Sequence, residues 1–350
     1  ILFYMRMLTA PLEELGEFGE IKKQLLNDRV CVALTGCVES QKLHMVYGLG
    51  DGFKNKLIVT FSDLRVKELA EDYRFYDRDV MVYPSGDLIF YQSDIRGKQL
   101  ASERIKCLRR ILEGKPVTVI TTFSSLLTPQ ISLGKWQGHL LKMKRGGILD
   151  EKNLANALVE IGYEKNYQVE GPGQFSIRGG IIDIFDLTEE NPYRIELWGD
   201  EIESIRSFDV LSQRSIENLS DIIIYPASEM ILSEEQLKRG MERVEKEGKE
   251  FSDRLRGEFH TQEAYRVETQ IRELKEQVFE FRNLINLDSY IRYFYDDTVS
   301  FLELFGKEGT CVFVDEPARV REHADAVELE FRESMVHRAE KGYILPGQMD

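Results

Sequence analysis

The sequence RVCVALTGCVESQKLHM (residues 29–45) has the order of features that decides the fold of the first part of the chain. An apolar run, residues 29–36, ends in Gly36, and Lys42 follows at the start of a helix-like stretch. A strand, a glycine-bearing loop and a helix in this order are typical of a phosphate-binding loop. We therefore expect residues 29–36 to be a strand of a parallel sheet, followed by a helix.

The loop departs from the pattern G-x-x-x-x-G-K-[ST] at positions that would hold a nucleotide. Gln41 replaces the second glycine, where the backbone must approach the phosphates closely. Leu43 replaces the hydroxyl residue that would bind Mg²⁺, and Glu39 adds negative charge where a triphosphate would lie. These differences predict a nucleotide site that has kept its fold and lost its chemistry.

A second signal of this kind is VFVDEP (residues 312–317), in which Asp315 and Glu316 end an apolar strand. In nucleotide-hydrolysing motors such an acidic pair binds Mg²⁺ and orients the attacking water. An acidic pair after a strand also arises by chance or as a helix N-cap, and here Pro317 follows it. The pair supports a nucleotide-binding ancestry only because it complements the loop.

Strand and helix signals alternate through the first part of the chain. Helical patterns cover residues 64–76 and 100–112. Continuous apolar strands separated by helices are typical of a parallel sheet with helices on both faces. The other apolar or β-rich runs that we expect to be strands are residues 56–63, 79–87, 116–127 and 309–317.

The pattern of predicted secondary structure changes twice along the chain. From about residue 139, short β-rich segments joined by turn residues predict a small, mostly antiparallel module. Later, apolar residues at helical spacing in 237–255 and 264–285 predict two long helices, with a hairpin as one arrangement. We expect an α/β lobe that begins with residues 1–138, an inserted domain at 139–227, and a helical hairpin with a return to the lobe at 228–350.

The composition excludes several classes of protein. It is 42% hydrophobic and 31% charged, as in soluble globular proteins, and its net charge of −15 opposes general binding to a DNA backbone. The four cysteines form no C-x-x-C pair and the five histidines are scattered, so we expect neither a metal site nor a disulfide framework. The chain has no membrane-length apolar stretch and no signal-peptide pattern, and position 1 is not methionine, so we expect a piece of a longer cytoplasmic protein.

The middle module carries the most specific motifs, RGGIIDIF (residues 178–185), PYRIELWGDEIESIRSFD (192–209) and QRS (213–215). Together with the altered loop and the Asp-Glu strand, they resemble the bacterial transcription-repair coupling factors (Mfd) and, more distantly, the helicase UvrB. The resemblance covers nearly the whole chain. It implies a RecA-like parallel-sheet lobe with a degenerate phosphate loop, an inserted, mostly antiparallel α+β domain, and a helical extension.

The resemblance also implies a function, which is recruitment without catalysis. In the family, the corresponding region lacks the ATP-site residues and the DNA-separating hairpin of UvrB, and its inserted domain binds UvrA. RNA polymerase and duplex DNA would bind to parts of the full-length protein outside this chain. The ATP-dependent translocase motor would also lie in those parts. We expect no cofactor. Two alternatives are an active ATP-dependent helicase lobe with an unorthodox loop and a DNA-binding UvrB-like module.

The segment YRIELWG (residues 193–199) indicates where contact with a partner occurs. Because alternate residues of a strand point to opposite faces, Ile195 and Leu197 should face the core. Arg194, Glu196 and Trp198 should then face outward. A tryptophan on a polar, outward face is out of place in an isolated domain, and Arg and Trp are enriched at interface hot spots.

Arg178 should share this outward face, because it alternates with apolar residues of its own strand. The resemblance implies that Arg178, Arg194 and Trp198 bind UvrA, with Glu196 at an acidic position between them; many family members have Phe at position 198. We expect replacement of either arginine by alanine to weaken binding and leave the fold intact. The alternative is that Arg194 and Glu196 form a cross-strand surface pair and Trp198 folds over the sheet edge.

Overall fold

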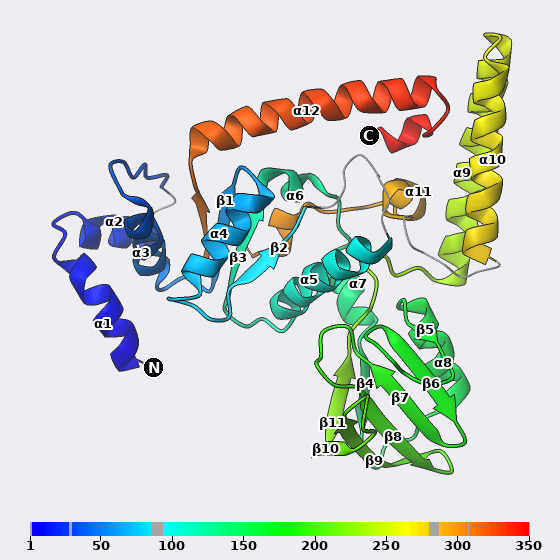
Figure 1. Cartoon of the computed structure of the whole chain (residues 1–350), viewed down its shortest axis with the longest axis horizontal. Coiled ribbons are helices and arrows are strands. Elements are labelled where there is room, and N and C mark those ends of the chain that lie inside the picture. Colours follow the sequence, from blue (N-terminus) through cyan, green and yellow to red (C-terminus); the bar gives the residue numbers. More distant parts are fainter. Residues whose placement is uncertain (1, 28–29, 86–93, 280–286, 307, 350) are drawn as a thin grey trace. The chain divides into compact units, whose positions relative to one another are not determined.

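A computed structural model describes residues 2–27, 30–85, 94–279, 287–306 and 308–349 (Figure 1). The chain divides into two compact units, each made of separate segments. The first unit holds Ile1–Gly86, Glu113–Thr128 and Phe301–Val327, and the second holds Asp87–Leu112, Pro129–Ser300 and Glu328–Asp350.

The first unit is built around a parallel sheet of strand order β12-β1-β3-β2. Every residue of β3 is buried, as are the last four of β1, because side chains on both faces of the sheet are covered. This confirms the α/β class expected for this part. The strands are β1 (Asn55–Thr60), β2 (Met81–Tyr83), β3 (Val117–Thr122) and β12 (Thr310–Val314).

Two helices join this sheet in one hydrophobic core. Leu43 of α3 (Glu39–Gly50) and Tyr73 of α4 (Asp63–Tyr73) lie in the same buried cluster as Ile58 and Ile120 of the sheet. A second cluster ties two N-terminal helices to α3, because its members are Leu12, Phe18, Met45 and Leu49. These helices are α1 (Leu2–Glu13) and α2 (Phe18–Asn27).

The strand that we expected at residues 29–36 is not formed in the part of it that the structure describes, residues 30–36. These residues have no regular secondary structure, and Val30 and Leu34 are exposed. No described strand pairs with them, so their backbone groups lack the ladder that would hold a strand together. A smaller difference is at residues 123–127, which form helix α6 (Phe123–Leu127) because the Thr122 side chain caps its first turn.

The second unit contains a mostly antiparallel sheet of strand order β10-β9-β8-β7-β6-β5, in which only the β5–β6 pair is parallel. One face is apolar and buries Phe175, Ile184 and Ile195, and α8 (Glu151–Glu160) packs on β5 and β6 with buried leucines. This confirms the expected antiparallel α+β module. The strands are β5 (Glu164–Lys165), β6 (Gln174–Arg178), β7 (Ile181–Phe185), β8 (Tyr193–Trp198), β9 (Glu201–Phe208) and β10 (Ser215–Leu219); beside them β4 (Leu141–Lys144) pairs with β11 (Asp221–Ile224).

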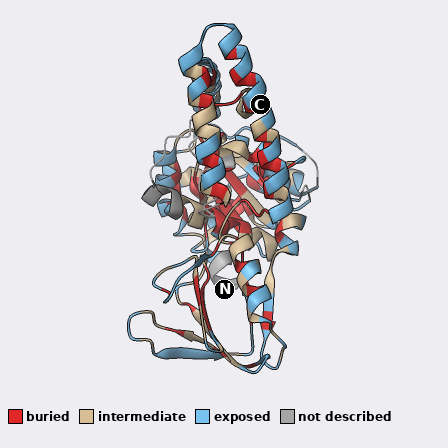
Figure 2. Cartoon of the chain, turned by 90° about the vertical axis from the view of Figure 1, so that its right-hand side faces the viewer, coloured by how far each residue is buried: buried red, intermediate tan, exposed pale blue. Residues whose placement is uncertain are grey.

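The predicted helical hairpin is also confirmed. Helices α9 (Glu234–Gly257) and α10 (Thr261–Phe279) pack along each other after a short turn, and Ser233 and Gln236 form a capping box at the start of α9. Their outer surfaces are exposed, whereas residues on their facing sides are buried (Figure 2). Residues 280–285 of the predicted second helix lie outside the described residues.

The remaining elements are short, except for α5 and α12. They are α5 (Asp94–Leu112), α7 (Leu133–Gly138), α11 (Ile291–Phe294), α12 (Pro317–Glu340) and the 3₁₀ turns η1 (Leu287–Tyr290), η2 (Phe301–Leu304) and η3 (Pro346–Gln348). Within the residues that the structure describes, no helix is long and apolar enough to cross a membrane.

Candidate functional site

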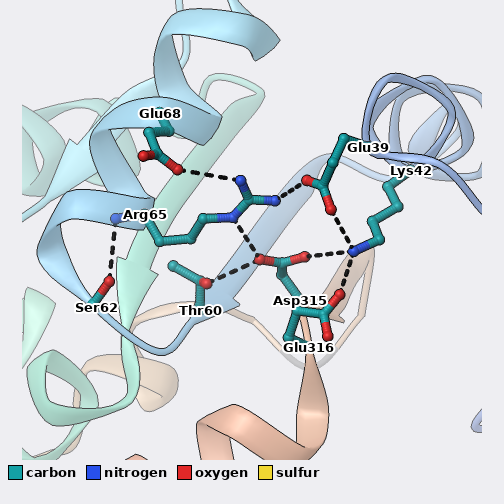
Figure 3. Close-up of polar contacts among 8 residues, drawn as sticks. All are labelled: Glu39, Lys42, Thr60, Ser62, Arg65, Glu68, Asp315 and Glu316. Carbon is teal, nitrogen blue, oxygen red and sulfur yellow. Dashed lines mark hydrogen bonds and ion pairs between the residues drawn. The ribbon is translucent and has the colours of Figure 1, made fainter.

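The structure brings the two nucleotide-site motifs together in a network of ion pairs (Figure 3). Lys42 lies in the first turn of α3, and its Nζ is 2.9 Å from Oε1 of Glu39 and 3.8 Å from Oδ1 of Asp315. The same ammonium group contacts the Glu316 carboxylate. Glu316 has a φ of +52°, a left-handed conformation that costs a non-glycine residue about 1 kcal/mol or more. The lysine is thus surrounded by three carboxylates of its own chain.

Arg65, which the sequence reasoning missed, completes this network from α4. Its Nε donates to Oδ2 of Asp315 at 3.1 Å, and its terminal nitrogens pair with Glu39 and Glu68. Thr60 also donates its hydroxyl to Oδ2 of Asp315, at 3.0 Å. The signal for Arg65 was its place just after β1, because the carboxyl ends of adjacent parallel strands meet at one edge of a sheet.

The charges of the network stabilise one another. Hydrogen bonds with Glu316 and Glu39 raise the pKa of Lys42. Hydrogen bonds from Lys42 and Arg65 lower the pKa of Glu39, and the hydrogen bond from Lys42 lowers that of Glu316. The Asp315 side chain is only 8% exposed, so it depends on these partners most. Lys42 and Arg65 are therefore each paired with carboxylates of the same chain.

The other three positions of the altered loop, Gly36, Gln41 and Leu43, are not part of this ion-pair network as the structure describes it. Leu43 is buried in the hydrophobic core, so the residue in the place of the Mg²⁺-binding hydroxyl serves packing. Gly36 has a φ of +76°, which favours glycine, and Gln41 is half-buried. Among the described residues, no group of three or more His, Cys, Asp or Glu side chains is placed to hold a metal ion.

A cavity of about 290 Å³ opens beside the network. The Arg319 guanidinium lies 4.3 Å from the centre of the Phe61 ring at its wall. The cavity is lined by residues of α3, α4 and α12 and of the β1–α4 and β12–α12 connections, which are Glu39, Phe61, Ser62, Leu64, Arg65, Glu68, Glu316 and Arg319.

The second candidate site is the polar face of the antiparallel sheet. Gly179 and Gly180 form the two-residue turn between β6 and β7, and both have positive φ, +57° and +83°. Positive φ at both central residues defines a type I′ turn, whose twist suits a hairpin. This turn sets Arg178 directly opposite Ile181, and Ile181 lies opposite Glu196 on β8.

Arg194 lies on this face as expected, but it is not a free, outward-pointing arginine. Its Nε donates to Oδ1 of Asp183 at 2.7 Å, and one terminal nitrogen donates to Oδ2 at 2.8 Å. The Asp183 side chain is 1% exposed, and these bonds raise the pKa of Arg194. Arg194 also lies 4.2 Å from the centre of the Phe208 ring. In contrast to the expectation from the sequence, these contacts predict that replacement of Arg194 affects the fold as well as binding.

The other three residues of the predicted patch are more accessible. Arg178 donates to Oδ2 of Asp183 at 3.1 Å, and its side chain is about a third exposed. Glu196 pairs with Arg206 and accepts a hydrogen bond from Ser204, whereas Arg194 pairs with Asp183, so the alternative of an Arg194–Glu196 surface pair is not what these residues form. Trp198 is 78% exposed, which rules out the alternative that it folds over the sheet edge.

Comparisons with known proteins agree with this architecture. The family described as UvrB interaction domain matches residues 141–230. The transcription-repair-coupling factor of Bacillus subtilis (strain 168) is 33% identical over 290 residues, which are 82% of this chain and 24% of that protein. That of Staphylococcus aureus (strain NCTC 8325 / PS 47) is 28% identical over 352 residues, 98% of this chain and 29% of that protein. The chain thus spans about a quarter of the length of these curated relatives.

Proposed function

Because the chain is a UvrB-like relative of the transcription-repair coupling factors, we propose that it recruits UvrA to sites of transcription-coupled repair. UvrA docks on the polar face of the antiparallel sheet, where it contacts Arg178, Glu196 and Trp198. Arg194 contributes indirectly, because its two hydrogen bonds fix the side chain of Asp183, to which Arg178 also donates. The observation that carries the proposal is the 78% exposure of Trp198 within the residues that match the UvrB interaction domain. A large aromatic side chain left open on a polar face is typical of a binding hot spot.

The proposed recruitment needs no nucleotide in this region. Lys42, the residue that would bind phosphate oxygens, is held by Glu39 and Glu316, and Asp315 is held by Arg65. A triphosphate would have to displace these carboxylates and bring its own metal ion against a positively charged guanidinium. We therefore propose that the nucleotide site is inactive. In a longer chain, other parts would contact RNA polymerase and duplex DNA and contain the translocase.

Titration with purified UvrA from the same organism tests the docking proposal. Wild-type chain should bind, and Trp198→Ala should weaken binding about 30-fold, the equivalent of about 2 kcal/mol for a hot-spot residue. Phe259→Ala is the matched control, because Phe259 is an equally open aromatic, 90% exposed, in the turn between α9 and α10. Equal affinities of wild type and Trp198→Ala, or no binding by wild type, would refute the proposal.

A further inference from the structure

We propose that the docking surface extends across the sheet from Trp198 to Tyr167, and that Tyr167 is its second aromatic anchor. This inference rests on the proposed binding of UvrA and concerns which part of the face makes the contact. Tyr167 lies two residues after the end of β5, which is the edge strand opposite β10 in the strand order. Neither its sequence position nor the motifs of the segment marked it as a binding residue.

The strand register places the members of this surface in one row. Arg178 on β6 lies opposite Ile181 on β7, which lies opposite Glu196 on β8, which in turn lies opposite Ser204 on β9. Side chains directly opposite in an antiparallel pair have Cβ atoms about 5 Å apart, so the row is continuous. At its β6 end, the Arg178 guanidinium lies 5.7 Å from the centre of the Tyr167 ring. Tyr167 is thus joined to the row through Arg178.

Three apolar side chains at this surface are exposed to solvent. Tyr167 is 84% exposed and Ile181 is 36% exposed, compared with 78% for Trp198. Single exposed apolar residues are common on soluble proteins. Here, however, Tyr167 and Ile181 flank the same arginine, and Trp198 follows two residues after Glu196, the neighbour of Ile181 in the register. Aromatic side chains bury about 150–250 Å² each, so two such rings can supply most of the apolar area of a hot spot.

The polar centre of the row indicates the chemistry of the partner. Glu196 is neutralised by Arg206. Arg178 uses one terminal nitrogen for Asp183 in the contacts that the structure describes, although a guanidinium carries five N–H donors. Its side chain is about a third exposed, so further donors can reach a ligand. A partner surface with a carboxylate between two apolar pockets fits this arrangement, because a carboxylate binds a guanidinium in two parallel hydrogen bonds.

Titration of UvrA with Tyr167 variants tests the inference. Tyr167→Ala should weaken binding about tenfold or more, as expected for the loss of an aromatic anchor, whereas Tyr167→Phe, which keeps the ring, should stay within about threefold of wild type. Tyr265→Ala is the matched control, because Tyr265 on α10 is also exposed, at 65%, and lies outside the row. Because Tyr167 is highly exposed, we expect these variants to fold like wild type, and thermal melts check that they do.

Two charged variants probe the acidic partner separately. Tyr167→Glu should weaken binding more than Tyr167→Lys, because a negative charge beside Arg178 repels a carboxylate and competes for the guanidinium. If Trp198→Ala weakens binding and Tyr167→Ala leaves it within twofold of wild type, the extension to Tyr167 is wrong and the proposed function stands. If Tyr167→Lys is the weaker binder, the acidic partner is wrong. If neither alanine variant weakens binding, the proposed function itself fails.

Discussion

The Nε atom of Arg65 lies 3.1 Å from Oδ2 of Asp315, so a side chain of the protein neutralises an acid of the type that binds Mg²⁺ in nucleotide-hydrolysing lobes. In the same way, Oε1 of Glu39 lies 2.9 Å from Nζ of Lys42 and supplies the negative charge that a phosphate would supply. Unlike a nucleotide and its metal ion, these groups are covalently attached and cannot dissociate. These ion pairs therefore contribute permanently to the fold of the lobe.

Removal of Arg65 should destabilise the first unit. Arg65→Ala leaves the nearly buried Asp315 with Thr60 and a lysine 3.8 Å away, and we expect a loss of about 2 kcal/mol. Urea denaturation measures the loss, and the double variant with Asp315→Asn isolates the pair. A coupling energy of about 1 kcal/mol or more is expected from such a cycle. Strictly additive effects of the two substitutions would show that the pair adds nothing.

The stabilisation by Lys42 should depend on pH at both extremes. The pKa values of Glu39 and Glu316 are lowered from 4.5, so their contribution is present above pH 4.5 and is lost as pH falls through the lowered values. The pKa of Lys42 is raised from 10.5, so its contribution is present below pH 10.5 and is lost as pH rises through the raised value. The difference in unfolding free energy between wild type and Lys42→Met should therefore be constant near neutral pH and shrink both in acid and in strong alkali.

Thermal melts across a range of pH test this dependence. Lys22→Met is a suitable control, because Lys22 forms a separate ion pair with Asp51. High salt should reduce the Lys42 effect, since Glu39 and Glu316 are substantially exposed and their ion pairs are screened. A wild-type-minus-Lys42→Met difference that persists unchanged below pH 4 would mean that the two glutamates do not mediate it.

Millimolar ATP with Mg²⁺ should leave the melting temperature of wild-type chain unchanged. A ligand present at 100 times its dissociation constant stabilises a protein by about 2.7 kcal/mol, so binding at a competent site would be plain in a melt. The outcome that contradicts an inactive site is a rise in melting temperature with Mg²⁺-ATP that disappears in Lys42→Ala. A rise that Lys42→Ala retains would indicate binding elsewhere.

The sequence predicted those features that depend on local pattern. The continuous apolar runs of β1, β3 and β12, the antiparallel module and the helical hairpin all follow from periodicity, and the structure contains them. The apolar run at 29–36 failed as a strand because β-structure depends on a pairing partner distant in sequence, which periodicity does not report. Arg65 was missed for a related reason, since its partner Asp315 is 250 residues away in the chain.

Arg194 and Arg178 looked alike in the sequence, and the structure predicts different roles for them. Both donate to Asp183, but Arg194 makes two bonds, at 2.7 and 2.8 Å, and Arg178 makes one, at 3.1 Å. Arg194→Ala should therefore cost about 3 kcal/mol of stability, because it leaves a buried carboxylate mostly uncompensated. Arg178→Ala should cost about 1 kcal/mol or less, since Asp183 keeps its bidentate partner and the lost bond is partly exposed.

Urea denaturation of both variants, alongside UvrA titration, separates stability from binding. Arg178→Ala should weaken UvrA binding with a nearly wild-type midpoint, whereas Arg194→Ala should lower the midpoint strongly. The double variant Arg194→Ala with Asp183→Ala should recover part of the lost stability, because removing the carboxylate also removes its desolvation penalty. If Arg194→Ala alone is as stable as Arg178→Ala, the bidentate pair does not support the fold, and Arg194 would then act by direct contact with the partner.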